Sequence, residues 1–195
     1  MSKNIMIVGV GGQGTLLASK ILGRAAMDSG MDVKVSEVHG MSQRGGSVVT
    51  YVRVGDEVYS PVIGRGDADV ILSFEVLEAA RWLPNLKNGG TLVTSTQQIN
   101  PMPVITGAAE YPEGLVDDMK ALGVDVRAFD APAIAAEAGS VRAANVALIG
   151  MAADVLGFDH DILRGAVAAC VPAKALEVNL KAFDTAVALA AEVKN

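Results

Sequence analysis

The stretch IMIVGVGGQGTLLASKILGRAA, residues 5–26, sets the fold of this chain. Residues 5–10 form a short continuous apolar run, which is typical of a strand buried on both faces of a parallel sheet. Glycines break the run, and apolar residues then recur at helical spacing, which predicts a helix over 15–30. Residues 32–38 alternate valine with polar residues and predict a second strand. The chain therefore opens as a Rossmann-like strand, helix and strand.

The pattern after this opening departs from a continuing dinucleotide-binding fold. Residues 39–46 (HGMSQRGG) have no apolar period and predict a loop. Residues 47–54 and 57–59 flank Gly55-Asp56, a composition that favours two antiparallel strands joined by a tight hairpin. Later apolar segments predict strands at 69–74, 90–95 and 124–129, and helices at 76–83, 116–122, 131–138, 141–156, 161–170 and 173–193.

The fold class follows from this order of elements. We expect one α/β domain over residues 1–195, with three α/β/α layers, a mostly parallel sheet and one antiparallel hairpin. A chain of 195 residues fits one domain, since domains usually hold about 100–200 residues. No repeat or linker divides it.

Composition excludes several classes of protein. A net charge of −6 argues against a protein that neutralises nucleic-acid phosphates. One cysteine excludes a disulfide within the chain and a four-thiolate cluster, and two histidines leave little for a zinc site. We see no targeting segment and no apolar run near the roughly 20 residues that span a bilayer, so we expect a soluble, cytoplasmic protein without a membrane partner.

The apolar fraction of 51% nevertheless indicates a partner surface. A mean hydropathy of +0.37 without a membrane span favours apolar surface reserved for another chain. Isolated copies of this chain could also associate through that surface.

The glycine loop allows two interpretations. Gly9, Gly11 and Gly14 match G-x-G-x-x-G between a strand and a helix, and Glu37 follows near the roughly 20-residue spacing of a ribose-binding acid. This pattern predicts a nicotinamide or flavin enzyme. Alternatively, the glycines only let the strand and helix pack closely. The predicted hairpin, and the lack of an obvious acid or base for hydride transfer, weigh against the first interpretation.

The loop at 39–46 holds the densest polar cluster in the chain. It leaves the carboxyl end of a predicted parallel strand, where open α/β sheets place ligands. Arg44 could pair with a carboxylate or phosphate, Gly45 and Gly46 could turn backbone N–H groups toward a ligand, and His39 could titrate near neutral pH. The alternative is a structural loop whose side chains satisfy backbone groups. We predict contact with a ligand or partner.

The chain resembles the 2-oxoacid:ferredoxin oxidoreductase family, in particular the beta subunits of its indolepyruvate (arylpyruvate) branch. The glycine segment marks the wider gamma-type domain of that family, and SEVHGMSQRGGSV is more specific to the arylpyruvate branch. The matching segments spread over most of the chain: 8–17 (VGVGGQGTLL), 36–49 (SEVHGMSQRGGSVV), 59–63 (YSPVI), 68–78 (ADVILSFEVLE) and 176–183 (LEVNLKAF).

The resemblance implies an oxidoreductase subunit that is inactive alone. The complex would convert arylpyruvates, coenzyme A and oxidised ferredoxin to aryl-acetyl-CoA, carbon dioxide and reduced ferredoxin. The alpha subunit would carry thiamine diphosphate, Mg²⁺ and the iron–sulfur clusters, with none of these bound by this chain alone. The sequence agrees, because it lacks a Gly-Asp-Gly segment followed by paired asparagines, the usual thiamine diphosphate signature. Ferredoxin would be a partner through the complex.

The resemblance also implies where the site lies. It assigns no catalytic residue and no metal ligand to this chain, and Glu75 could cap or orient a neighbour. The residues expected in the glycine turn are Gly11, Gly12, Gln13 and Gly14, and those expected to face the partner or the path of coenzyme A are His39, Gln43, Arg44, Gly45 and Gly46. The alternatives are a gamma subunit of another 2-oxoacid:ferredoxin oxidoreductase, an NAD(P)-binding Rossmann oxidoreductase, and an interaction module with no ligand.

Overall fold

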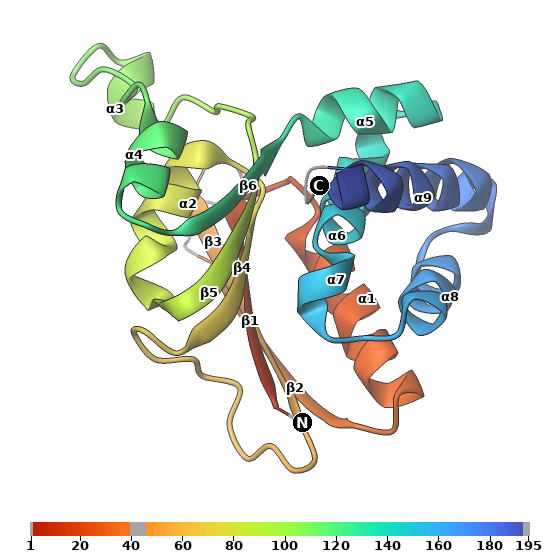
Figure 1. Cartoon of the computed structure of the whole chain (residues 1–195). Helices are drawn as coiled ribbons and strands as arrows, with labels where there is room; N and C mark the ends of the chain where they lie inside the picture. Colours follow the sequence, from red (N-terminus) through yellow and green to blue (C-terminus); the bar gives the residue numbers. More distant parts are fainter. Residues whose placement is uncertain (1, 40–45, 193–195) are drawn as a thin grey trace.

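A computed structural model describes residues 2–39 and 46–192, which form a six-stranded sheet between two layers of helices (Figure 1). The strand order is β2-β3-β1-β4-β5-β6. The strands are β1 (Lys3–Val10), β2 (Asp32–His39), β3 (Ser47–Gly55), β4 (Ala68–Ser73), β5 (Leu86–Ser95) and β6 (Asp125–Phe129). The prediction of a mostly parallel sheet is confirmed, since β1, β4, β5 and β6 pair in parallel.

The antiparallel part of the sheet differs from the predicted hairpin. β3 pairs antiparallel with β1 on one side and with β2 on the other, so β2 and β3 form the hairpin. Val52 lies opposite both Ile5 and Val35. Residues 57–59 form no strand, and the predicted pairing of 47–54 with them is wrong. The reason is that β1 and β2 already occupy both edges of β3.

Helices cover both faces of the sheet, as Figure 1 shows, and the expected three layers are confirmed. One face carries α1 (Thr15–Asp28), α5 (Ala131–Ala138), α6 (Ala144–Met151), α7 (Ala153–Leu156), α8 (His160–Cys170) and α9 (Leu176–Glu192). The other side carries α2 (Val76–Trp82), α3 (Met102–Ile105) and α4 (Leu115–Ala121). The described residues also form the short 3₁₀ helices η1 (Leu83–Asn85), η2 (Val141–Ala143) and η3 (Ala173–Ala175).

The position of strand β1 in the sheet explains why residues 5–10 form an unbroken apolar run. Successive side chains of a strand point to opposite faces. Ile5 and Ile7 belong to the core beneath α1 and α6, whereas Met6 and Val8 belong to the core beneath α2 and α4. All four side chains are completely buried. A central strand covered on both faces therefore holds the carboxyl edge of the sheet, which carries the glycine turn, in a fixed position.

One predicted helix is divided. The segment predicted as a helix over 141–156 forms η2, α6 and α7 instead. The Ala152 N–H bonds to the Ile149 carbonyl three residues back, which tightens the end of α6 and interrupts the α-helical pattern. Apolar spacing is nearly continuous across this break, so periodicity alone could not locate it.

Candidate functional site

The turn between β1 and α1 requires glycine at several positions for steric reasons. Gly12 and Gly14 have φ angles of 102° and 91°, in the left-handed region that favours glycine. A Cβ atom on Gly9 would lie 2.8 Å from Gln13 Oε1 and 3.0 Å from Phe74 Cβ. The glycine pattern therefore has a structural reason that does not depend on a bound nucleotide.

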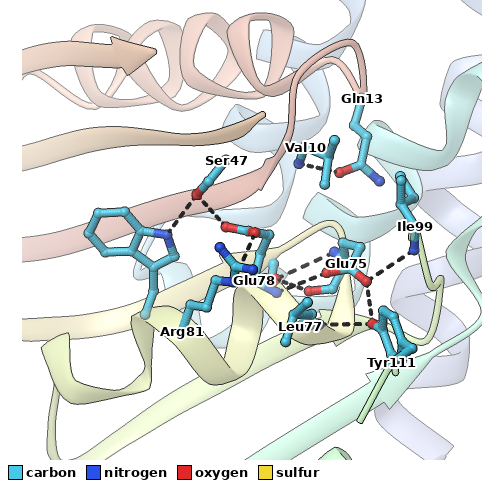
Figure 2. A network of polar contacts seen from close by, with 11 residues as sticks. Val10, Gln13, Ser47, Glu75, Leu77, Glu78, Arg81, Ile99 and Tyr111 are labelled. Carbon is cyan, nitrogen blue, oxygen red and sulfur yellow. Dashed lines mark hydrogen bonds and ion pairs between the residues drawn. The ribbon is translucent and has the colours of Figure 1, made fainter. Parts of the chain in front are cut away.

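Gln13 connects the ends of three strands at the carboxyl edge of the sheet. Its Oε1 accepts the Val10 N–H at 2.7 Å, at the end of β1 (Figure 2). Its Nε2 donates to the Phe74 carbonyl at 3.0 Å, just after β4, and to Gln97 Oε1 at 2.9 Å, after β5. One side chain thus fixes the relative positions of the loops that follow β1, β4 and β5.

Replacing Gln13 by alanine should lower the free energy of unfolding by about 2 kcal/mol, because the Val10 N–H and the Phe74 carbonyl lose a partner. Urea unfolding followed by circular dichroism would measure the loss. Gln98→Ala is the matched control: Gln98 is exposed on the segment after β5, beside the Gln97 partner of Gln13, and its substitution should change stability by less than about 0.5 kcal/mol. Equal stability of the two variants would contradict the role given to Gln13.

Two buried carboxylates lie at the start of α2. Glu75 is 1% exposed and caps the helix, because its Oε2 accepts the Glu78 N–H at 2.8 Å. This confirms the capping role expected for Glu75. Its Oε1 accepts the Ile99 N–H at 3.1 Å and the Tyr111 hydroxyl (Figure 2). The Tyr111 oxygen in turn accepts the Leu77 N–H at 3.2 Å. Glu75 therefore holds the start of α2 and both ends of the segment 99–111.

The second carboxylate, Glu78, faces β3. It is 4% exposed, and its Oε2 accepts the Ser47 hydroxyl at the start of β3. Its Oε1 lies 3.6 Å from Nε of Arg81, whose side chain is half exposed. The indole N–H of Trp82 reaches the Ser47 oxygen at 3.4 Å. Glu78 thus links α2 to the first residue of β3.

The Tyr111–Glu75 contact makes the free energy of unfolding change with pH in the alkaline range. Burial, together with the Glu75 carboxylate, raises the pKa of Tyr111 well above its usual value. The folded chain therefore holds the phenolic proton more tightly than the unfolded chain does. The stabilisation is complete below the unfolded pKa of about 10 and is lost as the pH rises from there toward the folded pKa.

Replacing Tyr111 by phenylalanine should therefore flatten the fall of unfolding free energy above about pH 10, because position 111 no longer carries a phenol whose ionisation is coupled to unfolding. At neutral pH we expect a loss of about 1–2 kcal/mol from the missing hydrogen bonds. Urea unfolding across the alkaline range would measure both effects. Tyr51→Phe retains the Tyr111–Glu75 contact and should keep the slope of the unsubstituted protein; a steep slope in Tyr111→Phe would refute the assignment.

The described residues form two clefts at this edge of the sheet, among others. We call the first the Arg142 cleft: it holds about 490 Å³ between the glycine turn and the segment from α5 to α6. Arg142 and Gln97 line it, and Asn145 Nδ2 donates to the Gly14 carbonyl at 3.4 Å. We call the second the Glu78 cleft: it holds about 420 Å³ between α2 and the segment 99–105.

The structure brings some of the predicted site residues together. The Gly11 N–H donates to the Gly46 carbonyl at 3.0 Å, so the end of the polar loop contacts the glycine turn. His39 ends β2. Gln43, Arg44 and Gly45 lie outside the described residues, as does the side chain of His39. This bond places Gly11 and Gly46 side by side at one edge of the sheet.

Other residues of this edge were not predicted. Asn145 was visible in the sequence only as a polar interruption of an apolar stretch, and the burial of Glu78 had no sequence signal at all. Arg142 and Tyr111 reach the edge from segments far along the chain. Tertiary contacts, rather than a local motif, assemble them.

The nicotinamide interpretation loses support in this geometry. In a dinucleotide-binding fold the second strand lies beside the first, so that its acidic end can reach the ribose. Here β3 lies between β1 and β2. The Glu37 carboxylate instead accepts the Ser19 hydroxyl of α1 at 3.2 Å.

The described part of the chain offers neither a metal cluster nor a membrane-spanning helix. Within residues 2–39 and 46–192, no three or more His, Cys, Asp or Glu side chains gather closely enough to hold a metal ion. Every helix in that part of the chain is too short or too polar to span a bilayer.

Comparison with known proteins identifies the family. Residues 4–189 match the family model described as pyruvate ferredoxin/flavodoxin oxidoreductase. This chain belongs to that family. It is 46% identical to indolepyruvate oxidoreductase subunit IorB of Pyrococcus horikoshii, over 98% of each chain. It is also 38% identical to the IorB subunit of Methanothermobacter thermautotrophicus, over 98% of this chain and all of that one. The resemblance found in the sequence is confirmed.

Solved structures of the family share the fold. The gamma subunit of a keto/oxoacid ferredoxin oxidoreductase from Geobacter sulfurreducens matches with a TM-score of 0.72 and 26% identity, over 97% of this chain and 99% of that chain. A 2-oxoglutarate:ferredoxin oxidoreductase from Magnetococcus marinus matches with a TM-score of 0.73 and 22% identity; this chain covers 31% of that one. The fold of this family member therefore occurs both as a separate subunit and within a longer chain.

Proposed function

We propose that this chain is the beta subunit of an indolepyruvate (arylpyruvate):ferredoxin oxidoreductase. The observation that carries this proposal is the 46% identity to an IorB subunit over 98% of both chains. The alternative, a gamma subunit of another 2-oxoacid:ferredoxin oxidoreductase, is favoured by the shared fold of the Geobacter sulfurreducens subunit, but at only 26% identity. The main proposal therefore has the stronger support.

The reaction is an oxidative decarboxylation carried out by the complex. The bond between the carboxylate and the carbonyl carbon of an arylpyruvate breaks, and carbon dioxide leaves. The acyl carbon forms a thioester with coenzyme A, and two oxidised ferredoxins each accept one electron while the thiol proton is released. This chain has one cysteine and cannot supply the four thiolates of a cluster. We assign thiamine diphosphate, Mg²⁺ and the iron–sulfur clusters to the alpha subunit.

This chain would contribute shape and contacts to that reaction. We propose that the glycine turn (residues 11–14) and the loop 39–46 face the alpha subunit or the path of coenzyme A. The hydrogen bond between Gly11 and Gly46 supports this, because it joins the two segments at one edge of the sheet. Gln13 stiffens that edge through its bonds to Val10 and Phe74. A preorganised surface loses less conformational entropy when the partner binds.

Reconstitution from purified subunits tests the proposal. This chain alone and the alpha subunit alone should fail to reduce ferredoxin with indolepyruvate and coenzyme A, and the mixture should reduce it. Parallel assays with pyruvate and 2-oxoglutarate separate the main proposal from its alternative. The main proposal expects indolepyruvate to be the preferred substrate, whereas the alternative expects another 2-oxoacid. Turnover by this chain alone, or tight saturable binding of NADH to it, would overturn the proposal.

A further inference from the structure

The Glu78 cleft has an excess of negative charge. Glu75 and Glu78 are 1% and 4% exposed, and both line the cleft. Among the described residues, the cation paired with either carboxylate is Arg81, at 3.6 Å from Glu78 and half exposed to solvent. Both carboxylates accept hydrogen bonds, but these bonds do not neutralise their charge, and the nearby cation is half exposed. An additional positive group placed in this cleft would lie close to Glu78 and be attracted to it.

An apolar arm borders the same cleft. The segment 99–111 leaves the sheet edge, carries α3 and returns; Figure 1 shows α3 projecting beyond the sheet. Glu75 accepts hydrogen bonds from both ends of this arm, at Ile99 and Tyr111. Met102 and Ile105 line the cleft, yet each remains 64% exposed. The arm is therefore held firmly at its base while it presents apolar side chains to solvent.

We propose that the Glu78 cleft receives a basic side chain borne on an apolar segment of the alpha subunit. The lysine or arginine would approach Glu78, and the apolar residues beside it would pack on Met102 and Ile105. This inference rests on the function proposed above, because it names the surface through which this chain would join that complex. Desolvated aromatic or arginine anchors in such pockets often dominate binding energy.

Charge complementarity favours this occupant over two others. A second copy of this chain, in a two-fold contact, would bring an identical acidic cleft and a net charge of −6 against the first. An anionic ligand would have to approach two buried carboxylates to reach one guanidinium. A cationic segment of another subunit meets neither obstacle.

Binding of the purified alpha subunit to variants of this chain tests the inference. Glu78→Gln should weaken binding by about 10- to 100-fold, and the affinity of this variant should depend less on salt. Glu177→Gln is the matched control: it makes the same chemical change at an exposed glutamate in the first turn of α9, and should leave affinity unchanged. Arg81→Gln should tighten binding several-fold, because it removes the competing cation from Glu78.

A second pair of variants avoids any effect of Glu78 on folding. Met102→Ser should weaken binding, whereas Leu122→Ser should not, because Leu122 is 74% exposed at the far end of α4. The melting temperature of each variant shows whether it is folded. Weaker binding of Arg81→Gln would mean that the cleft takes an anionic group, and wild-type affinity in both Glu78→Gln and Met102→Ser would overturn the inference. If the unsubstituted chain neither binds nor activates the alpha subunit, the proposed function itself fails.

Discussion

Replacing Gly150 by alanine should destabilise the protein by about 3 kcal/mol, although alanine is the better helix former. Gly150 lies in α6, where that helix packs against α9. A Cβ atom there would lie 2.6 Å from the Phe183 carbonyl oxygen and 2.9 Å from Ala186 Cβ. Neither neighbour can move freely, because one is helix backbone and the other is a completely buried methyl group. The two helices must therefore separate, and the core around Phe183 loosens.

The matched control, Gly165→Ala, should change the free energy of unfolding in the opposite direction. Gly165 lies in α8 at an exposed position, with no atom within 4 Å of the place a Cβ would take. Gly165→Ala should stabilise the protein by about 0.5–1 kcal/mol, through helix propensity and a less flexible unfolded chain. Urea unfolding of both variants measures the difference. A Gly150→Ala protein as stable as Gly165→Ala would show that α6 and α9 do not pack this closely.

Truncating Glu75 to alanine should cost about 3–4 kcal/mol, since three donors lose the carboxylate that accepts their hydrogen bonds. The N–H of Glu78 loses its cap, and the Ile99 N–H and the Tyr111 hydroxyl lose their common acceptor. In addition to this loss of stability, the arm 99–111 should detach from the start of α2, because both of its ends are bonded to Glu75. Thermolysin digestion under native conditions should therefore cleave the Glu75→Ala arm much faster than the arm of the unsubstituted chain.

Glu110→Gln serves as the control for this experiment. Glu110 is an exposed glutamate on the same arm, directly before Tyr111, and its substitution should change stability by less than about 0.5 kcal/mol. Both chains keep the same cleavable residues in the arm. If Glu75→Ala lost stability without faster cleavage of the arm, Glu75 would stabilise α2 but not hold the arm.

The central strands and most helices could be predicted from local pattern. Residues 5–10 are apolar throughout because β1 is buried on both faces, and an unbroken apolar run of this length is typical of a central strand. The capping role of Glu75 also follows from its place between a strand and a helix. The glycine turn was equally visible, yet its pattern alone left nucleotide binding open, since close packing against Gln13 and Phe74 requires the same residue.

Strand pairing and the composition of the clefts could not be predicted in this way. The backbone groups of 47–55 can pair with any strand edge, and only the assembled sheet shows that β1 and β2 occupy both edges. The sequence carries no signal for the burial of Glu78 or for the contact of Tyr111 with Glu75, because both depend on neighbours from distant segments. The parallel core, the glycine turn and the family are thus encoded in local runs of residues. The strand order and the acidic cleft arise only when the chain folds, because a contact between two distant segments leaves no periodic signal in the sequence of either segment.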